Sequence, residues 1–145
     1  MPQPTVKQVW DALVAATRAS GLFKDVKALP VNVVNDVRFL DNFPGLKLPA
    51  CLIVFLDRAR DIHGSGDERN LQFNAILVDS DPKGLAYGDN INRLEALEDA
   101  ICDRYILDDQ VIVHGSTQAR PAITNPRFSV YQLALSTRQA DERQT

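Results

Sequence analysis

Residues 57–68 hold the side chains best placed to do chemistry in this 145-residue chain. Asp57, Asp61 and His63 occupy positions of the same parity, so in a strand they would share one face. Two carboxylates and a histidine could bind a metal ion, or His63 could act as a general base. Structural zinc needs four ligands, however, and no second histidine or cysteine lies nearby. The pattern therefore favours a solvated hairpin with charges of both signs over a metal or catalytic site.

Three other short motifs lack the setting that their chemistry needs. Gly64-Ser65-Gly66 has no Gly-Lys-Ser/Thr ending and no strand-to-helix context, both of which a phosphate-binding loop requires. Ser65 or Ser116 could be assembled into a triad, but the Gly-x-Ser-x-Gly nucleophile elbow is absent. Asp108-Asp109 would oppose the dipole of a preceding helix and is expected to face solvent, with a divalent cation as the alternative. We therefore expect no catalytic, cofactor-binding or metal-binding residues and no enzyme activity.

Composition indicates a soluble, globular chain of one domain. The hydrophobic fraction is 45%, the charged fraction is 24% and the net charge is -3. The acidic balance and the scattered basic residues disfavour a nucleic-acid-binding surface. No apolar stretch approaches the roughly 20 residues that span a bilayer, and no signal peptide is recognisable. We expect a cytoplasmic protein with one domain over residues 1–145, of which residues 139–145 form a flexible tail.

Hydrophobic periodicity predicts the elements that position the polar segment. The expected helices are 5–20 and 89–107, and the expected strands are 31–39, 50–56, 71–77, 111–114 and 128–137. Thr5 and Gln8 have capping-box spacing, and Gly21 is a plausible C-terminal cap. In the last strand the apolar phase shifts between Val130 and Tyr131, which indicates a bulge or burial on both faces.

The strands at 50–56 and 71–77 are expected to form the two arms of a long β-hairpin. The first arm is almost wholly apolar and is predicted to be buried on both faces. Residues 57–70 would then form the outer part of the hairpin and its tip. The predicted fold is α+β, with an antiparallel or mixed β-sheet, two helices packed on one face and a long β-hairpin.

Three residues have simpler interpretations than a functional one. Trp10 lies on the apolar face of the first helix, where core packing is expected and a subunit contact is the alternative. Cys51 lies in an apolar run and Cys102 in a helical pattern, so both are interpreted as buried thiols.

The layout resembles the tail terminator (tail completion) proteins of long-tailed bacteriophages, especially the Mu-like tail terminator family. Organisation carries the resemblance over residues 5–137: an N-terminal amphipathic helix, a buried strand, a long charged hairpin, a second helix and a closing strand. The quoted segments are Leu48-Pro49-Ala50-Cys51-Leu52-Ile53-Val54, Leu94-Glu95-Ala96-Leu97 and Phe128-Ser129-Val130-Tyr131-Gln132-Leu133.

The resemblance implies a structural role in the virion, after assembly in the host cytoplasm. Such proteins form a homo-hexameric ring that caps the tail tube, stops its elongation and provides the interface for head–tail joining. The implied partners are the tail tube protein and the head–tail connector protein, with no membrane, no specific nucleic acid and no cofactor. DNA can pass through the lumen of such a ring.

The outer hairpin is the first candidate for the ring contacts, because charges of both signs give an interface specificity. Loops 39–47 and 118–127 are further candidates. The interface candidates in the hairpin are Arg58, Arg60, Asp61, His63, Asp67, Glu68 and Arg69.

Three other functions stay open at this stage. The first is another phage neck or head–tail connector protein. The second is a small cytoplasmic enzyme that uses Asp57, Asp61 and His63. The third is a nucleic-acid-binding module, which the net charge disfavours.

Overall fold

The computed structural model describes residues 4–29, 45–63, 66–80, 87–107, 111–121 and 128–140, and at positions 59–63, 66–68, 87–88, 116–121, 128 and 139–140 it describes the backbone alone. These ranges contain two helices and six strands and form an α+β fold, as the sequence predicts. In chain order the elements are α1 (Val6–Ala19), β1 (Asp25–Leu29), β2 (Ala50–His63), β3 (Gly66–Ser80), α2 (Tyr87–Ile101), β4 (Arg104–Ile106), β5 (Val111–Pro121) and β6 (Phe128–Ala140).

Local interactions and backbone conformation set the two ends of α1. The hydroxyl of Thr5 accepts a hydrogen bond from the Gln8 N–H at 3.1 Å, and the Gln8 side-chain oxygen accepts one from the Thr5 N–H at 2.8 Å. This reciprocal pair is the predicted capping box. At the other end Gly21 has a φ of +73°, a left-handed conformation that glycine adopts without steric cost. The sequence therefore predicted the limits of this helix correctly.

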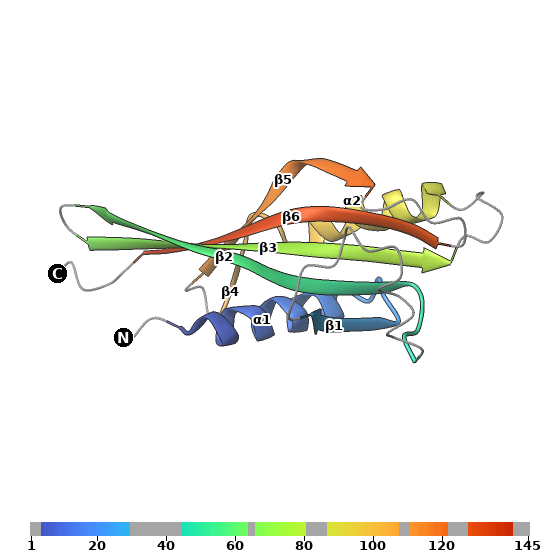
Figure 1. Cartoon of the computed structure of the whole chain (residues 1–145), viewed down its shortest axis with the longest axis horizontal. Coiled ribbons are helices and arrows are strands. Elements are labelled where there is room, and N and C mark those ends of the chain that lie inside the picture. The colour runs from blue at the N-terminus through green and yellow to red at the C-terminus, as the bar shows by residue number, and fades with distance from the viewer. Residues whose placement is uncertain are drawn as a thin grey trace.

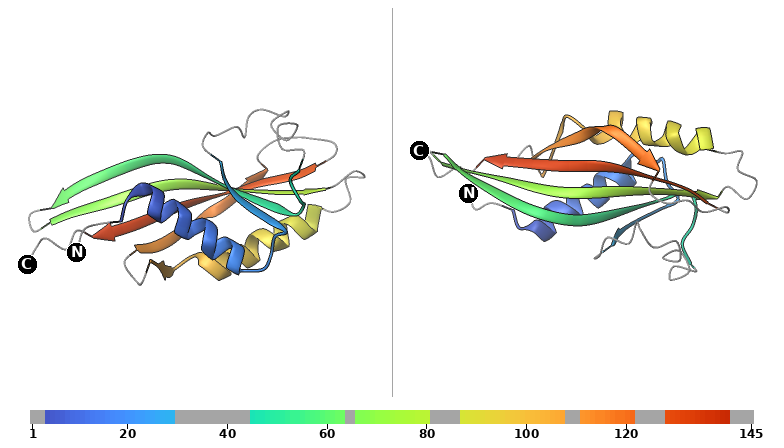
Figure 2. Two further views of the ribbon diagram at one scale, coloured as in Figure 1. Left: turned by 90° about the horizontal axis from the view of Figure 1, so that it is seen from below. Right: turned by 45° about the horizontal axis from the view of Figure 1, so that its top comes forward.

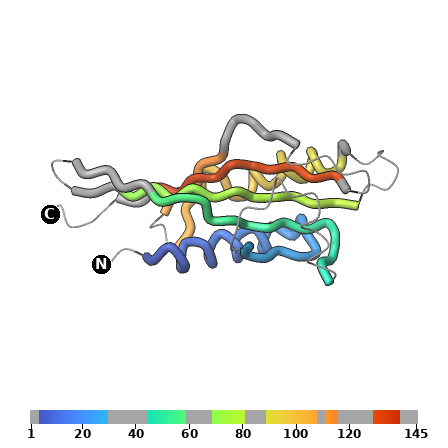
Figure 3. The backbone as a smooth tube through the Cα atoms, viewed as in Figure 1, coloured from blue at the N-terminus to red at the C-terminus, as the bar shows by residue number. Residues whose placement is uncertain are grey.

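The six strands form one mixed sheet in the order β1-β2-β3-β6-β5-β4. β1 runs parallel to β2, whereas each of the other neighbouring pairs is antiparallel. β2, β3 and β6 run side by side through the middle of the molecule (Figure 3). The last strand of the chain therefore returns to the centre of the sheet, between β3 and β5.

Both helices cover the same face of the sheet, as predicted (Figure 2). Val9 and Leu13 of α1 and Leu94 and Leu97 of α2 are all at most 2% exposed. They pack against alternate residues of the strands, because successive residues of a strand point to opposite faces. The strand residues in this main core are Val26, Cys51, Ile53, Leu71, Phe73, Ala75, Leu77, Val111, Val113, Leu133 and Leu135.

The opposite face of the sheet carries a second, smaller apolar cluster at one end. It contains Leu29, Leu52, Val54, Ile76, Val78 and Val130, with Leu46 and Leu48 packed against it. Residues 50–54 are all 0% exposed because this cluster covers one face of β2 and the main core covers the other. Burial on both faces is confirmed for this part of β2.

The predicted second helix was too long. α2 ends at Ile101, and residues 104–106 form β4. The backbone turns at Asp103, which has a φ of 58° and donates its N–H to the carbonyl of Val113 at 2.7 Å. The periodicity continued to Tyr105 in sequence, but that side chain is 57% exposed on an edge strand. A contact with β5, distant in sequence, overrides the local pattern.

Several observed strands also differ from the predicted ones. β1 was not predicted, and the predicted strand 31–39 lies outside the described residues. β5 and β6 are both longer than expected, and with β4 they give three strands after α2 instead of two. β6 pairs with β3 without a register shift, so the apolar phase change reflects burial of both Ser129 and Val130, at 7% and 3% exposure.

A candidate assembly surface on the β2–β3 hairpin

β2 and β3 form the long hairpin that the sequence predicts. The pair is antiparallel from Ala50 opposite Val78 to His63 opposite Gly66. β1 pairs with β2 only as far as Val54, and the outer hairpin runs past the ends of both helices (Figure 1). It is therefore the part of the described chain that projects furthest from the two apolar cores.

The pairing register of the hairpin shifts at Leu56. Phe55 lies opposite Phe73, whereas Asp57 lies opposite Gln72, so one extra residue is accommodated in β2. Leu56 is 41% exposed, in contrast to the buried residues before it. An extra residue reverses the alternation of faces along a strand. The shift therefore decides which charged residues of the outer hairpin lie on the helix side of the sheet.

Arg58 and Arg69 stand at the base of the outer hairpin on its helix side. Arg58 lies opposite Leu71, a residue of the main core, and Arg69 precedes Leu71 by two positions. The Arg69 guanidinium donates a hydrogen bond to the carbonyl of Pro4, just before α1. Burial first, and then the positive charge of Arg58, lower the pKa of Arg69 below its ordinary value. The N-terminal end of α1 is thereby tied to the hairpin.

Five other interface candidates have a described backbone only. Arg60, Asp61 and His63 lie in β2, and Asp67 and Glu68 lie in β3. By register, Arg60 is opposite Arg69 and Asp61 is opposite Glu68. All seven candidate positions therefore belong to one antiparallel ribbon.

The structure describes the group Asp57, Asp61 and His63 only in part. Asp57, Asp61 and His63 share a face by register, as the sequence predicted. The Asp57 side chain is exposed and accepts a hydrogen bond from the Arg58 N–H at 2.7 Å, while the side chains of Asp61 and His63 lie outside the description. Among the side chains described, no three of the His, Cys, Asp and Glu residues gather as a metal site would require.

The remaining motifs fall mostly outside the described residues. This applies to Gly64-Ser65, to Asp108-Asp109 and to the Ser116 side chain. The candidate loops 39–47 and 118–127 are also largely outside. His114 is described, and its Nδ1 lies 3.6 Å from a carboxylate oxygen of the exposed Asp103.

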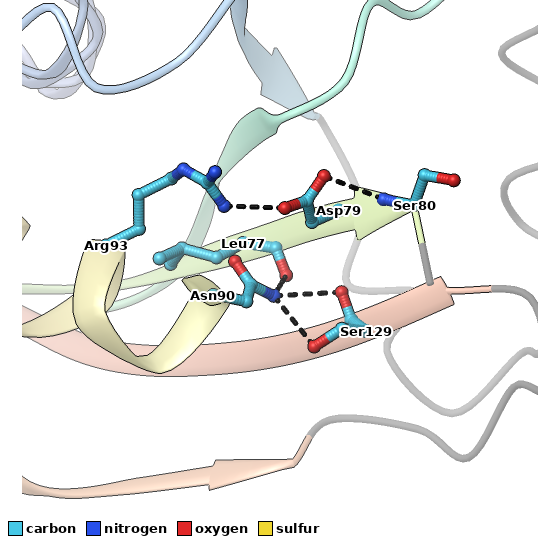
Figure 4. A network of polar contacts seen from close by, with 6 residues as sticks. All are labelled: Leu77, Asp79, Ser80, Asn90, Arg93 and Ser129. Atoms are coloured by element: carbon cyan, nitrogen blue, oxygen red, sulfur yellow. Dashed lines mark hydrogen bonds and ion pairs between the residues drawn. The ribbon is translucent and has the colours of Figure 1, made fainter. Parts of the chain in front are cut away.

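A buried polar network, which the sequence did not predict, attaches α2 to the sheet (Figure 4). The Asn90 side-chain amide donates to the carbonyl of Leu77 at 3.2 Å, and to the carbonyl and hydroxyl of Ser129 at 2.9 and 3.2 Å. Arg93 forms an ion pair with Asp79 at 2.7 Å. The residues come from α2, β3 and β6, so no local spacing in the sequence could reveal the network. Its role is to position α2.

Trp10 packs against the core, as expected. Its ring centroid lies 6.1 Å from that of Phe55 and 6.5 Å from that of Phe73. Its indole N–H donates to the carbonyl of Ile53 at 2.9 Å. The indole thus satisfies its single donor while its apolar surface joins α1 to β2 and β3.

The two cysteines are free thiols in different surroundings. Cys51 is fully buried, as predicted, and burial raises the pKa of its thiol. Cys102 is only half-buried, so the prediction of two buried thiols was wrong for this residue. Burial, and then the negative charges of Glu98, Asp103 and Asp99, raise the pKa of Cys102 to about 11.

Within the described ranges, neither α1 nor α2 has the length and apolarity that crossing a membrane requires.

Comparisons with known proteins find similarity in structure but not in sequence. No protein-family model matches the chain, and no curated protein matches it. A chain of a solved structure, described as a virion of a native gene transfer agent particle, aligns with a TM-score of 0.60 at 12% sequence identity. The alignment covers 92% of this chain and 95% of the other. At this identity the likeness shows a shared fold over most of both chains.

Proposed function

We propose that this chain is a single-domain structural subunit of a phage-like virion, and more specifically a tail terminator. In this role it forms a hexameric ring on the end of the tail tube, stops elongation of the tube and presents the surface that meets the head–tail connector. The mechanism is geometric capping and catalyses no reaction. The observation that carries the proposal is the fold shared with a gene transfer agent virion chain over nearly the full length of both chains.

The arrangement of the molecule supports a role in assembly. Two helices and a six-stranded sheet form a well-packed body, and a charged hairpin extends beyond that body. A rotationally symmetric ring needs two different surfaces on each copy, one for each neighbour. The hairpin positions Arg58, Arg60, Asp61, His63, Asp67, Glu68 and Arg69 are proposed to take part in these contacts.

Electron microscopy of the purified protein tests the proposal, together with light-scattering mass over a concentration series and in the presence of isolated tail tubes. Six-fold rings that bind at tube ends and stop tube elongation are the expected result. Binding to the isolated head-side connector, without binding to tubes, would favour another neck protein. A chain that stays monomeric at all concentrations and ignores both partners would contradict the proposal.

A further inference from the structure

The outer hairpin carries opposite charges on its two faces. In an antiparallel pair, residues directly opposite each other share a face, and successive residues alternate. Arg58 lies opposite the core residue Leu71, which fixes the helix side of the ribbon. Arg69 has the same parity as Leu71, and Arg60 is opposite Arg69. Three arginines therefore occupy the helix side of the ribbon, which we call the arginine face.

The other face of the same ribbon is acidic. Asp57 lies opposite Gln72, an exposed residue on the side away from the helices. Asp61 and Glu68 lie opposite each other on this side. These three carboxylates define the acidic face.

Neighbouring positions weaken this separation of charge without removing it. Asp67, nearer the tip, lies on the arginine face by register. Arg138 of β6 lies opposite Asn70 and so belongs to the acidic face. Each face thus has three charges of its own sign and one of the other.

The register of the outer hairpin places like charges opposite each other. Arg60 is opposite Arg69, and Asp61 is opposite Glu68, so both cross-strand charge pairs join like with like. Like charges directly opposite each other destabilise a strand pair, whereas opposite charges stabilise it. Burial is the main cause of the lowered pKa of Arg69, and the positive charge of Arg58 on the same face lowers it further. A neighbouring surface of opposite charge would complement each face.

We propose that the two faces are the complementary halves of a head-to-tail contact between copies of this chain. The arginine face of one copy packs on the acidic face of the next. This inference rests on the proposed ring function and identifies its subunit contact. A contact between two different surfaces of the same chain is heterologous and closes into a ring when the rotation between copies allows it.

A second copy fits both faces better than a nucleic acid does. A nucleic acid would bind the arginine face but would be repelled by the acidic face on the same ribbon. The net charge of -3 adds to that repulsion. A neighbouring copy supplies both complements at once, and such complementarity fixes register as well as orientation.

Reversing one face at a time provides the test. Arg58→Glu with Arg60→Glu makes both faces acidic, and Asp61→Lys with Glu68→Lys makes both faces basic. Each variant alone should need a protein concentration roughly tenfold or more above that of the wild type to assemble, on tail tubes or in solution. An equimolar mixture should assemble again with the two variants alternating, provided that the ring has an even number of copies. The chain with all four substitutions should also assemble alone, because its faces are exchanged.

A matched control changes charge elsewhere on the molecule. Lys24→Glu with Lys27→Glu changes the net charge by the same amount as the arginine reversal. Both side chains are exposed, one just before β1 and one in it, and the double substitution should leave assembly unchanged. Circular dichroism and thermal unfolding establish that each variant is folded. If a reversal unfolds the hairpin, Arg58→Gln with Arg60→Gln removes the charge without reversing it and should still weaken assembly.

The outcomes separate this inference from the proposed function. Rings that form equally well from either single-face variant would overturn the inference and leave the ring function intact. Failure of both the mixture and the four-substitution variant to assemble, with all chains folded, would also overturn it. A DNA fragment that binds the wild type and is lost on arginine reversal, without any change in assembly, would assign the arginine face to nucleic acid instead. Wild-type protein that forms no ring, alone or on tubes, would overturn both.

Discussion

At the scale of single residues, Gly115 and Cys102 are packed too closely to tolerate a larger side chain at position 115. A Cβ atom at position 115 would lie 2.5 Å from the Cys102 sulfur, well inside van der Waals contact. The same Cβ would lie 3.6 Å from the Cys102 Cβ, an ordinary contact. The obstacle is therefore the sulfur atom alone, and β5 approaches the end of α2 because position 115 is glycine.

Gly115→Ala is expected to lower the free energy of unfolding by about 1–3 kcal/mol through overpacking. In a Cys102→Ala background the same substitution should lower the free energy of unfolding much less, because the sulfur atom is absent. Urea denaturation of the four proteins of this double-mutant cycle measures the coupling. Gly45→Ala, where nothing lies within 4 Å, is the control and should be close to neutral. Equal costs of Gly115→Ala in both backgrounds would contradict the packing account.

Asn90 provides a second test at this scale, since α2 carries the same residue type at an exposed position. Asn90→Ala removes a fully buried amide that donates to three oxygen atoms of Leu77 and Ser129. The expected loss of stability is about 1–3 kcal/mol. Asn92→Ala, on the exposed side of the helix, should change stability by less than about 0.5 kcal/mol. Similar denaturation midpoints for the two variants would refute an anchoring role for Asn90.

Cys102 should react slowly with thiol reagents. Its pKa of about 11, compared with an ordinary value of 9.0, leaves roughly 100-fold less thiolate at pH 8. Because the pKa is raised, the alkylation rate should keep increasing with pH until about pH 11. Mass spectrometry of iodoacetamide-treated native protein over a pH series measures this rate, with urea-unfolded protein as the control. A native rate that levels off near pH 9 would contradict the expected shift.

At the scale of elements, the hairpin consists of an inner part that belongs to the core and an outer part that does not. The inner part is buried on one or both faces as far as Phe55 on β2 and Leu71 on β3. Beyond them the pairing continues as a charged ribbon. Stability and assembly should therefore depend on different parts of the same hairpin.

Replacing residues 59–70 with Asn-Gly should preserve folding and abolish ring formation. The new hairpin closes with a two-residue turn between Arg58 and Leu71, and Asn-Gly suits the turn type that this connection requires. Thermal unfolding of the shortened chain should stay cooperative. By comparison, Leu97→Ala in the core of α2 should lower the free energy of unfolding by about 2–5 kcal/mol. Assembly is followed by light scattering on tail tubes. A shortened chain that still forms rings would remove the outer hairpin from the mechanism.

At the scale of the whole molecule, the sheet presents two unlike surfaces. The helices cover one face, and the smaller apolar cluster covers only one end of the other. The described residues further along this open face are mostly polar, among them Gln72, Gln132, Ser136 and Arg138. A contact between copies is therefore expected to depend on charge rather than on a large apolar patch.

Ring assembly should accordingly weaken with salt. Raising the ionic strength from about 0.05 to about 0.5 M shortens the Debye length well below 10 Å and screens exposed charge pairs. The concentration for half-assembly, measured by light scattering, should rise over this range. A contact dominated by apolar burial would be insensitive to added salt or would strengthen, and either result would contradict the charge-based contact.

Much of the fold could be predicted from the sequence because it depends on near neighbours. The Thr5–Gln8 capping box and Gly21 limit α1 through contacts within a few residues. The apolar run beginning at Ala50 predicts a strand buried on both faces, because a short apolar run without alternation is typical of such a strand. The hairpin follows from this strand and the alternating strand predicted at 71–77, which a polar segment separates.

The tertiary structure alone decided the remaining features, because each depends on groups far apart in the chain. α2 stops at Ile101 because β4 pairs with β5, and Asn90 is buried because β6 lies beside β3. The seven candidate residues of the hairpin could be named from the sequence, but the side of the sheet on which each of them lies could not. One unpaired residue, Leu56, reverses the alternation of faces, and the partner strand determines where that residue falls.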